Sequence, residues 1–132
     1  MAAKKRAKTR RQSAAPRVEN LEFVVEADED ANPEDYLFQD PEYREQDQER
    51  LDAFNRGYWR MVGVRAEVEV TIAGTVQTIR TPGVWAVESD SGQSYFNDLG
   101  TQEYAELLAI LAEIGIPKNR VPKASTGRWV ER

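Results

Sequence analysis

The sequence predicts an α+β fold: an antiparallel meander of three to four strands covered by a C-terminal helix. Residues 59–90 hold the densest apolar pattern of the chain, with nearly unbroken alternation over residues 62–72 and a turn signal at Ala73-Gly74. Residues 104–114 place apolar side chains at helical spacing. A sheet with one apolar face needs a cover, and this helix supplies it.

The strands are expected in the following places. Residues 62–72 form a half-buried strand whose even-numbered residues face the core, while Arg65, Glu67 and Glu69 face solvent beside Gly63. Residues 75–80 return as its antiparallel partner, and residues 84–87 follow as a strand covered on both faces. Residues 93–96 continue as a fourth short strand or as an aromatic loop, and residues 21–25 pair as an edge strand.

An additional helix is expected on the surface, N-terminal to the strands. Asp40-Pro41-Glu42 is a helix start, with Asp as the cap and Pro in the first position, and Gly57 supplies the stop. The helix between them has few apolar positions, so it is expected to hold the core by its last turns. The preceding residues 32–38 are expected to dock their aromatic side chains on the domain or on a partner.

The covering helix is expected to start near residues 97–101, with Asp98 or Thr101 as its cap. It turns its acids, Glu103 among them, to solvent and stops at Gly115 and Pro117. The remaining residues, 117–132, are basic and rich in breakers, which predicts an extended tail. Trp129 is its one anchor, and it docks on the domain or contacts a partner.

The chain therefore divides into a disordered basic arm (residues 1–18), a single acidic α+β domain (19–116) and a basic extended tail (117–132), and both basic ends are expected to be disordered. The net charge of −5 hides this division. Residues 1–17 hold seven basic residues and no acid, residues 19–115 hold 22 acids against six arginines, and residues 116–132 hold five basic residues and one acid. An acidic domain of this kind repels nucleic acid and attracts basic surfaces, including grooves that hold DNA or RNA.

The chain has no cysteine and no histidine. Disulfides, thiolate nucleophiles, the usual serine triads and most zinc sites are thereby excluded, and no glycine-rich phosphate loop is present. Glu67 and Glu69 share one strand face and could divide acid and base roles, but alternating Glu is also ordinary patterning of an exposed strand. The protein is expected not to be an enzyme and to need no cofactor or metal.

No apolar run approaches the length of a membrane span, and the basic start is not followed by the apolar core of a secretory signal. A cytoplasmic protein with no membrane partner is expected.

Two stretches, WRMVGVRAEVEV at residues 59–70 and GVWAVESDS at residues 83–91, resemble a group of small uncharacterised proteins of bacteriophages, plasmids and other bacterial mobile elements. The likeness covers roughly residues 36–115. It implies an accessory or counter-defence role, without a mechanism.

The first functional hypothesis is a non-enzymatic interaction protein that binds a protein with a basic surface and inhibits a host defence enzyme, in the manner of a DNA mimic or an anti-CRISPR protein. Its partner-binding acids are expected to be Glu42, Glu45, Asp47, Glu49, Glu67, Glu69, Glu88 and Asp90. A purely solubilising role for this acidic surface stays open.

The alternative hypothesis is a nucleic-acid-binding accessory protein that contacts phosphates through the basic arm and the basic tail. The contacts in the arm would be Lys4, Lys5, Arg6, Lys8, Arg10 and Arg11. The sequence leaves the oligomeric state open.

Overall fold

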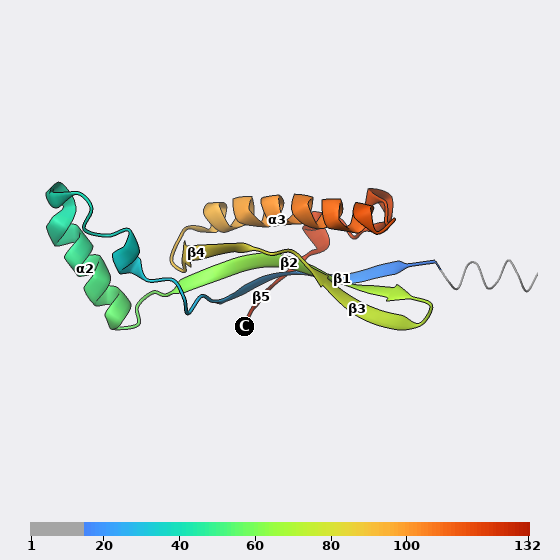
Figure 1. The fold of residues 1–132 in the computed structure, drawn as a ribbon, viewed down its shortest axis with the longest axis horizontal. Helices are drawn as coiled ribbons and strands as arrows, with labels where there is room; N and C mark the ends of the chain where they lie inside the picture. The colour runs from blue at the N-terminus through green and yellow to red at the C-terminus, as the bar shows by residue number, and fades with distance from the viewer. Residues whose placement is uncertain (1–14) are drawn as a thin grey trace, which may run out of the picture.

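A computed structural model describes residues 15–132 as a five-stranded mixed sheet with a long helix over one face (Figure 1). The α+β class is thereby confirmed. The strands are β1 (Arg17–Ala27), β2 (Met61–Ile72), β3 (Thr75–Arg80), β4 (Val84–Glu88) and β5 (Arg128–Glu131), and the helices are α2 (Arg44–Asn55) and α3 (Gln93–Glu113). Four short 3-10 turns lie at Pro33–Asp35, Pro41–Tyr43, Lys118–Arg120 and Ala124–Thr126.

The long strand β2 organises the sheet. One of its edges pairs with β1, and its other edge pairs with β3 along residues 67–72 and with β4 along residues 61–64. The predicted meander is therefore wrong, because β4 returns to β2 and does not pair with β3. The six residues of β3 leave half of the twelve-residue β2 edge open, and β4 satisfies the backbone groups there.

The hairpin between β2 and β3 is confirmed at Ala73-Gly74. Both residues have positive φ, 50° for Ala73 and 81° for Gly74, as a type I′ turn requires. This turn fixes the register in which Ile72 lies opposite Thr75.

The prediction that residues 21–25 form an edge strand is wrong. β1 has eleven residues and lies inside the sheet, antiparallel to β2 on one side and parallel to β5 on the other. The register shifts between Glu19 and Glu22, where Asn20 has a φ of 57°. This bulge interrupts the alternation of inward residues, which hid the first half of the strand from the periodicity argument.

The C-terminal end is also ordered, contrary to the prediction of disorder. β5 pairs parallel with β1, so that Trp129 lies beside Phe23 in the register. The two rings stack with centroids 5.1 Å apart, and Trp129 also fills the space over Gly100 of α3. Docking of Trp129 on the domain is confirmed.

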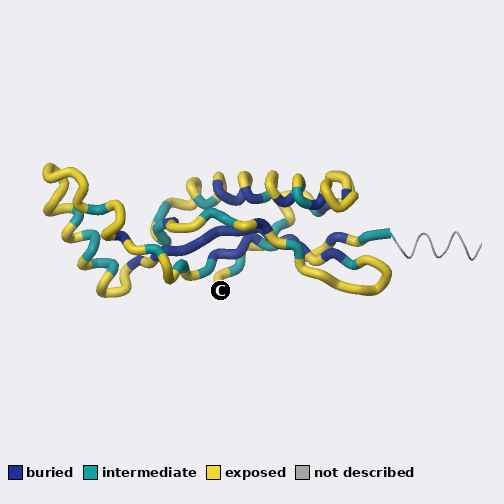
Figure 2. Tube along the Cα trace, viewed as in Figure 1, coloured by how far each residue is buried: buried dark blue, intermediate teal, exposed yellow. Residues whose placement is uncertain are grey.

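The helix α3 closes the core. It begins at Gln93, with Gly92 in the cap position, so residues 93–96 are its first turn and neither a strand nor a loop; the predicted start near residues 97–101 is wrong. Its buried face begins with Phe96 and Leu99 and continues through Leu107 and Leu111, which are fully buried over β1 and β2 (Figure 2). Gly115, with a φ of 88°, ends the helix as predicted.

Glu103 of α3 is buried, which the sequence did not predict. It lies over the corner between β3 and β4, where the Thr81 hydroxyl donates to it at 2.6 Å, and the Thr81 oxygen accepts from the Ala66 N–H at 3.0 Å. Only 2% of Glu103 is exposed. Burial raises the pKa of Glu103, while hydrogen bonds from Thr81 and the Gly83 backbone oppose this rise.

The helix α2 lies apart from the sheet, at one end of the molecule (Figures 1 and 2). Asp40 caps the preceding 3-10 turn by accepting from the Glu42 N–H at 3.0 Å, and Gly57 follows the helix with a φ of 80°. None of its twelve residues is buried. As expected, its last turn holds the core, because Phe54 packs on the buried Trp59 just before β2.

We expect Trp129→Ala to lower the free energy of unfolding by about 2 to 4 kcal/mol, because it removes the anchor of β5 and leaves a cavity over Phe23 and Gly100. Chemical denaturation followed by circular dichroism measures the loss. Tyr58→Ala is the matched control, since Tyr58 is 74% exposed. Equal stability of the two variants would contradict the role given to β5.

The raised pKa of Glu103 predicts a pH dependence. Protons bind more tightly to the folded than to the unfolded carboxyl, so this group stabilises the fold below its unfolded pKa and loses that contribution as pH rises through its folded pKa. As pH falls from 7 to 4, the free energy of unfolding of the natural protein should therefore rise relative to that of Glu103→Gln. Denaturation at several pH values measures it, and a difference independent of pH would contradict the assignment.

Candidate functional site

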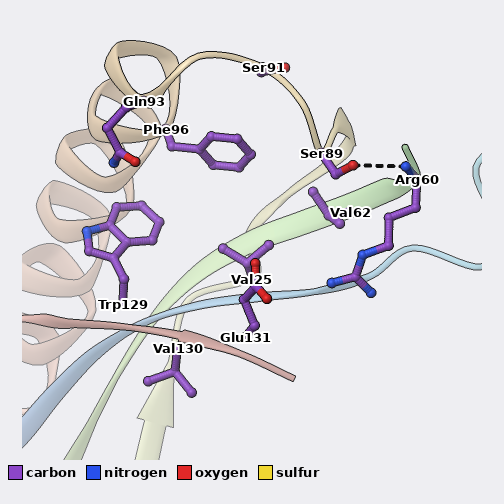
Figure 3. A pocket seen from close by; sticks show the side chains of 10 residues that line it. All are labelled: Val25, Arg60, Val62, Ser89, Ser91, Gln93, Phe96, Trp129, Val130 and Glu131. Carbon is purple, nitrogen blue, oxygen red and sulfur yellow. Dashed lines mark hydrogen bonds between the residues drawn. The ribbon is translucent and has the colours of Figure 1, made fainter. Parts of the chain in front are cut away.

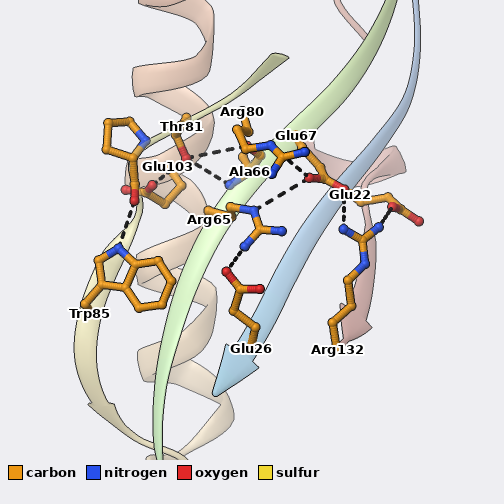
Figure 4. A network of polar contacts seen from close by, with 11 residues as sticks. Glu22, Glu26, Arg65, Ala66, Glu67, Arg80, Thr81, Trp85, Glu103 and Arg132 are labelled. Atoms are coloured by element: carbon orange, nitrogen blue, oxygen red, sulfur yellow. Dashed lines mark hydrogen bonds and ion pairs between the residues drawn. The ribbon is translucent and has the colours of Figure 1, made fainter. Parts of the chain in front are cut away.

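The sheet face that α3 leaves uncovered carries charges that neutralise one another (Figure 4). Glu67 lies at the centre of this face with only 5% of its surface exposed, and Arg65 is 7% exposed. Arg132 Nη1 lies 2.8 Å from Glu67 Oε1, and Arg65 Nε lies 3.6 Å from Glu67 Oε2. The prediction that Glu67 and Arg65 face solvent is wrong, because long side chains from neighbouring strands fold across β2.

The other acids of this face are also engaged. Glu22 pairs with Arg128 at 2.6 Å and with Arg132 at 3.0 Å, and Glu26 pairs with Arg65. Glu69 is exposed and accepts a hydrogen bond from Asn20 at 3.0 Å. Altogether five acids (Glu19, Glu22, Glu26, Glu67, Glu69) stand among five arginines (Arg17, Arg65, Arg80, Arg128, Arg132). The charged side chains of this face therefore sum to zero, and the face does not attract a charged partner.

Glu88 and Asp90, two further acids of the predicted partner surface, are held by Arg50 of α2. Arg50 contacts both Asp90 oxygens at 2.6 Å and Glu88 Oε1 at 3.0 Å. The hydrogen bond from Arg50 holds the pKa of Asp90 below its usual value. The two acids therefore fasten α2 to the end of β4 and are not free for a partner.

Aromatic side chains complete this attachment. The Arg50 guanidinium lies 3.7 Å from the ring centre of Trp59, whose Nε1 donates to the Arg50 carbonyl at 3.0 Å. Tyr36 donates its hydroxyl proton to Glu88 at 2.6 Å. The segment of residues 32–38 thus docks on its own domain through Tyr36, while Phe38 stays 38% exposed.

Residues 28–58, which join β1 to β2 and are called the acidic segment from here on, hold most of the free negative charge. They contain eleven acids and three arginines, one of which is Arg50. Glu42, Glu45 and Glu49 are exposed, and Asp47 is half-buried because it accepts from the Phe38 N–H at 3.0 Å. Of the eight acids predicted to bind a partner, Glu42, Glu45 and Glu49 are exposed without a side-chain partner among the described residues, and Glu69 is exposed with only Asn20 bonded to it.

A pocket of about 420 Å³ opens beside the start of α3 (Figure 3). Phe96 and Trp129 contribute to its apolar wall, and Arg60 is among its polar residues. The Ser89 hydroxyl accepts from the Arg60 N–H at 2.9 Å, and the Ser91 hydroxyl donates to the Glu88 carbonyl at 2.7 Å. Both hydroxyls are thus bonded to backbone groups rather than to a base, and the pocket presents no activated nucleophile.

Within residues 15–132, no group of three or more acids is placed to hold a metal ion. No helix of this part of the chain is long and apolar enough to cross a membrane. The six basic residues predicted to contact nucleic acid, Lys4, Lys5, Arg6, Lys8, Arg10 and Arg11, lie outside the described residues.

Sequence reasoning missed the arginines that neutralise the predicted acids. Arg50 lies 38 and 40 positions from Glu88 and Asp90, and Arg132 lies 110 positions from Glu22. No local spacing links such pairs. The available signal was the apolar pair Trp129-Val130 between charged residues, with Arg128 before it and Glu131 and Arg132 after it. This is the pattern of a short strand rather than of a disordered end.

Comparison with protein-family models, with curated proteins and with solved structures finds no match for this chain. The origin in a mobile element therefore stays a prediction.

We expect Arg50→Met to loosen α2, because it leaves Glu88 and Asp90 without their cation and removes the stacking on Trp59. The free energy of unfolding should fall by about 1 to 3 kcal/mol. Amide hydrogen exchange should become faster across α2 and stay unchanged in β2. Arg56→Met is the control, since Arg56 is exposed and forms no ion pair among the described residues. Slow exchange of α2 in Arg50→Met would show that the helix is held by other contacts.

Proposed function

We propose that the chain is a non-enzymatic interaction protein that binds a basic surface of another protein through its acidic segment. In this proposal the partner is a nucleic-acid-handling host enzyme, and the acidic segment occupies the groove in which that enzyme holds DNA or RNA. The observation that carries the proposal is the separation of charge: the sheet face is neutral, while the acidic segment holds eleven acids and three arginines.

The distribution of charge argues against a merely solubilising surface. A solubilising surface carries both signs spread over the whole protein, whereas here most of the free acids lie in one segment and only a few, such as Asp98, Glu106 and Glu113, lie on α3. A concentrated field of one sign attracts an oppositely charged groove and raises the rate of encounter.

The carboxylates of the segment are also ordered along a line. Glu42 is exposed in the 3-10 turn just before α2. Within α2, Glu45, Glu49 and Asp52 are exposed and follow one another at intervals of four and three residues, which places them on one side of the helix. Their spacing along the axis is about 4.5 to 6 Å at 1.5 Å per residue. Phosphates of one DNA strand follow one another at about 3.4 Å along its axis, so the charge repeat is of similar size.

The acidic segment is presented in a fixed orientation. The salt bridges from Arg50 to Asp90 and Glu88 tie α2 to β4, and the contact of Phe54 with Trp59 ties its last turn to the start of β2. A rigid element loses less conformational entropy on binding than a flexible acidic tail would lose. Because no residue of α2 is buried, its whole outer side is accessible to a partner.

Two of the five basic residues of the tail give no support to the nucleic-acid-binding alternative. Arg128 and Arg132 already pair with Glu22, and Arg132 pairs with Glu67 as well. Lys118, Arg120 and Lys123 of the tail are exposed and form no ion pair within residues 15–132, so that alternative now rests on these three residues and on the arm of residues 1–14.

The test uses a ten-residue oligoarginine peptide as a basic probe and calorimetry at low salt. We expect the triple variant E42Q/E45Q/E49Q to bind it about tenfold more weakly than the natural protein, since three exposed charges contribute roughly 0.3 to 1 kcal/mol each. In a second measurement, the natural protein should release a fluorescent oligonucleotide from the peptide, and the triple variant should do so poorly.

The control is D98N/E106Q/E113Q, which removes three exposed acids from α3 and changes the net charge equally. If both triple variants lose affinity equally, binding follows net charge alone and the acidic segment is not a binding surface. If the natural protein itself retains the oligonucleotide in a gel shift, and loses it when residues 1–14 are removed, the alternative replaces this proposal.

A further inference from the structure

We propose that the groove beside Trp85 receives an arginine side chain of the basic partner. This inference rests on the proposed function and deepens it, because it assigns a second contact that is specific for arginine rather than for positive charge in general.

Trp85 is fixed as a platform on the sheet. Its ring lies against the backbone of Gly63 in β2, where a Cβ atom would overlap the ring. Its Nε1 donates to the Pro82 carbonyl at 2.9 Å, which sets the rotation of the ring. Trp85 is nevertheless 44% exposed, so the ring side turned away from Gly63 is open to solvent.

An open groove of about 650 Å³ lies next to this ring, bordered by Trp85 and Ala86 on one side and by residues 27–31 on the other. Asp28 fixes the two sides relative to each other, since it accepts from the Ala86 N–H at 2.8 Å and from the Asp30 N–H at 3.2 Å. Ala86 has a φ of 58°, a conformation that turns its N–H out of the regular ladder and toward Asp28. These hydrogen bonds therefore fix the two sides of the groove relative to each other.

Glu29 and Asp30 place free carboxylates at the groove. Both are exposed, and neither forms an ion pair within residues 15–132. They belong to the start of the acidic segment, so a basic surface that covers this segment also reaches Trp85.

The chain itself contains the completed form of such a site. Arg50 stacks on Trp59 at 3.7 Å while it pairs with the two carboxylates of Glu88 and Asp90. The groove at Trp85 has the same components, an indole face with two carboxylates beside it, but no arginine among the described residues lies over the ring. We infer that the partner supplies it.

Arginine fits this site better than lysine. The guanidinium is planar, so it stacks on an indole face and at the same time donates two parallel hydrogen bonds to a carboxylate. A lysine ammonium is a compact, strongly hydrated charge, which gains less from an exposed aromatic ring.

The test compares ten-residue oligoarginine and oligolysine peptides on the full chain. The natural protein should bind oligoarginine about threefold to tenfold more tightly than oligolysine through the Trp85 contact. Trp85→Leu should abolish most of this preference while binding oligolysine nearly as well as before, and Trp85→Phe should keep part of it. Tyr95→Leu is the control, because Tyr95 is a similarly exposed aromatic residue on α3.

Two further measurements keep the inference testable if Trp85→Leu is poorly folded. The indole N–H signal of Trp85 in an NMR spectrum of the natural protein should shift on addition of oligoarginine and much less on addition of oligolysine. The double variant E29Q/D30N, which leaves the ring in place, should lower the oligoarginine affinity more than the oligolysine affinity.

The two proposals fail in different ways. An unchanged peptide preference in Trp85→Leu, together with an unshifted Trp85 signal, would overturn the arginine site while binding through α2 persists. If Trp85→Leu loses the preference for oligoarginine but E42Q/E45Q/E49Q binds as the natural protein does, the acids of α2 and its preceding turn are not the main surface, and the arginine site stands. If neither peptide binds the natural protein at low salt, both proposals are wrong.

Discussion

The structure depends on how one carboxylate, Glu67, is accommodated in the middle of its sheet. A buried carboxylate is tolerated only when cations of the chain compensate the loss of water. Arg65 of β2, Arg80 of β3 and Arg132 beyond β5 converge on it from three strands. Because Arg65 Nε and Glu67 Oε2 make no hydrogen bond to another described group, much of the compensation falls to Arg132. The C-terminal strand is thereby tied to the centre of the fold by charge as well as by Trp129.

This pairing also decides where the protein is negative. Arginines of the chain's last residues return to the sheet and cancel its acids, and Arg50 does the same for the turn after β4. Most of the acids left over lie in the acidic segment, away from the core, where their mutual repulsion does not oppose the packing of the sheet. Stability and a concentrated negative surface are therefore compatible in this fold because they occupy different parts of the chain.

The sequence predicted the parts of the fold that local patterns encode. The β2–β3 hairpin follows from alternation and the Ala73-Gly74 turn, and the covering helix follows from the spacing of Leu107 and Leu111. The pairing of β4 with β2, the parallel position of β5 and the burial of Glu103 depend on contacts between distant residues, for which local spacing carries no information. The alternating pattern of β2 led to one wrong prediction. It shows that Glu67 lies on the face opposite the core, but it does not show whether other side chains cover that face.

The same limit applies to the candidate site. Acid counts identified a negative domain, yet of the predicted acids the structure leaves Glu42, Glu45 and Glu49 exposed without a side-chain partner among the described residues, whereas Glu69 and Asp90 are exposed but bonded to Asn20 and Arg50. In this protein a carboxylate with an arginine of the same chain within reach is structural, and a carboxylate without one is free to bind a partner. One example of each kind lies beside a tryptophan. At Trp59 the arginine is Arg50, and the site holds α2 in place. At Trp85, Gly63 and Asp28 position the ring and the carboxylates, but the described part of the chain places no arginine there. The arginine contact that Arg50 makes at Trp59 is therefore left at Trp85 for a second molecule.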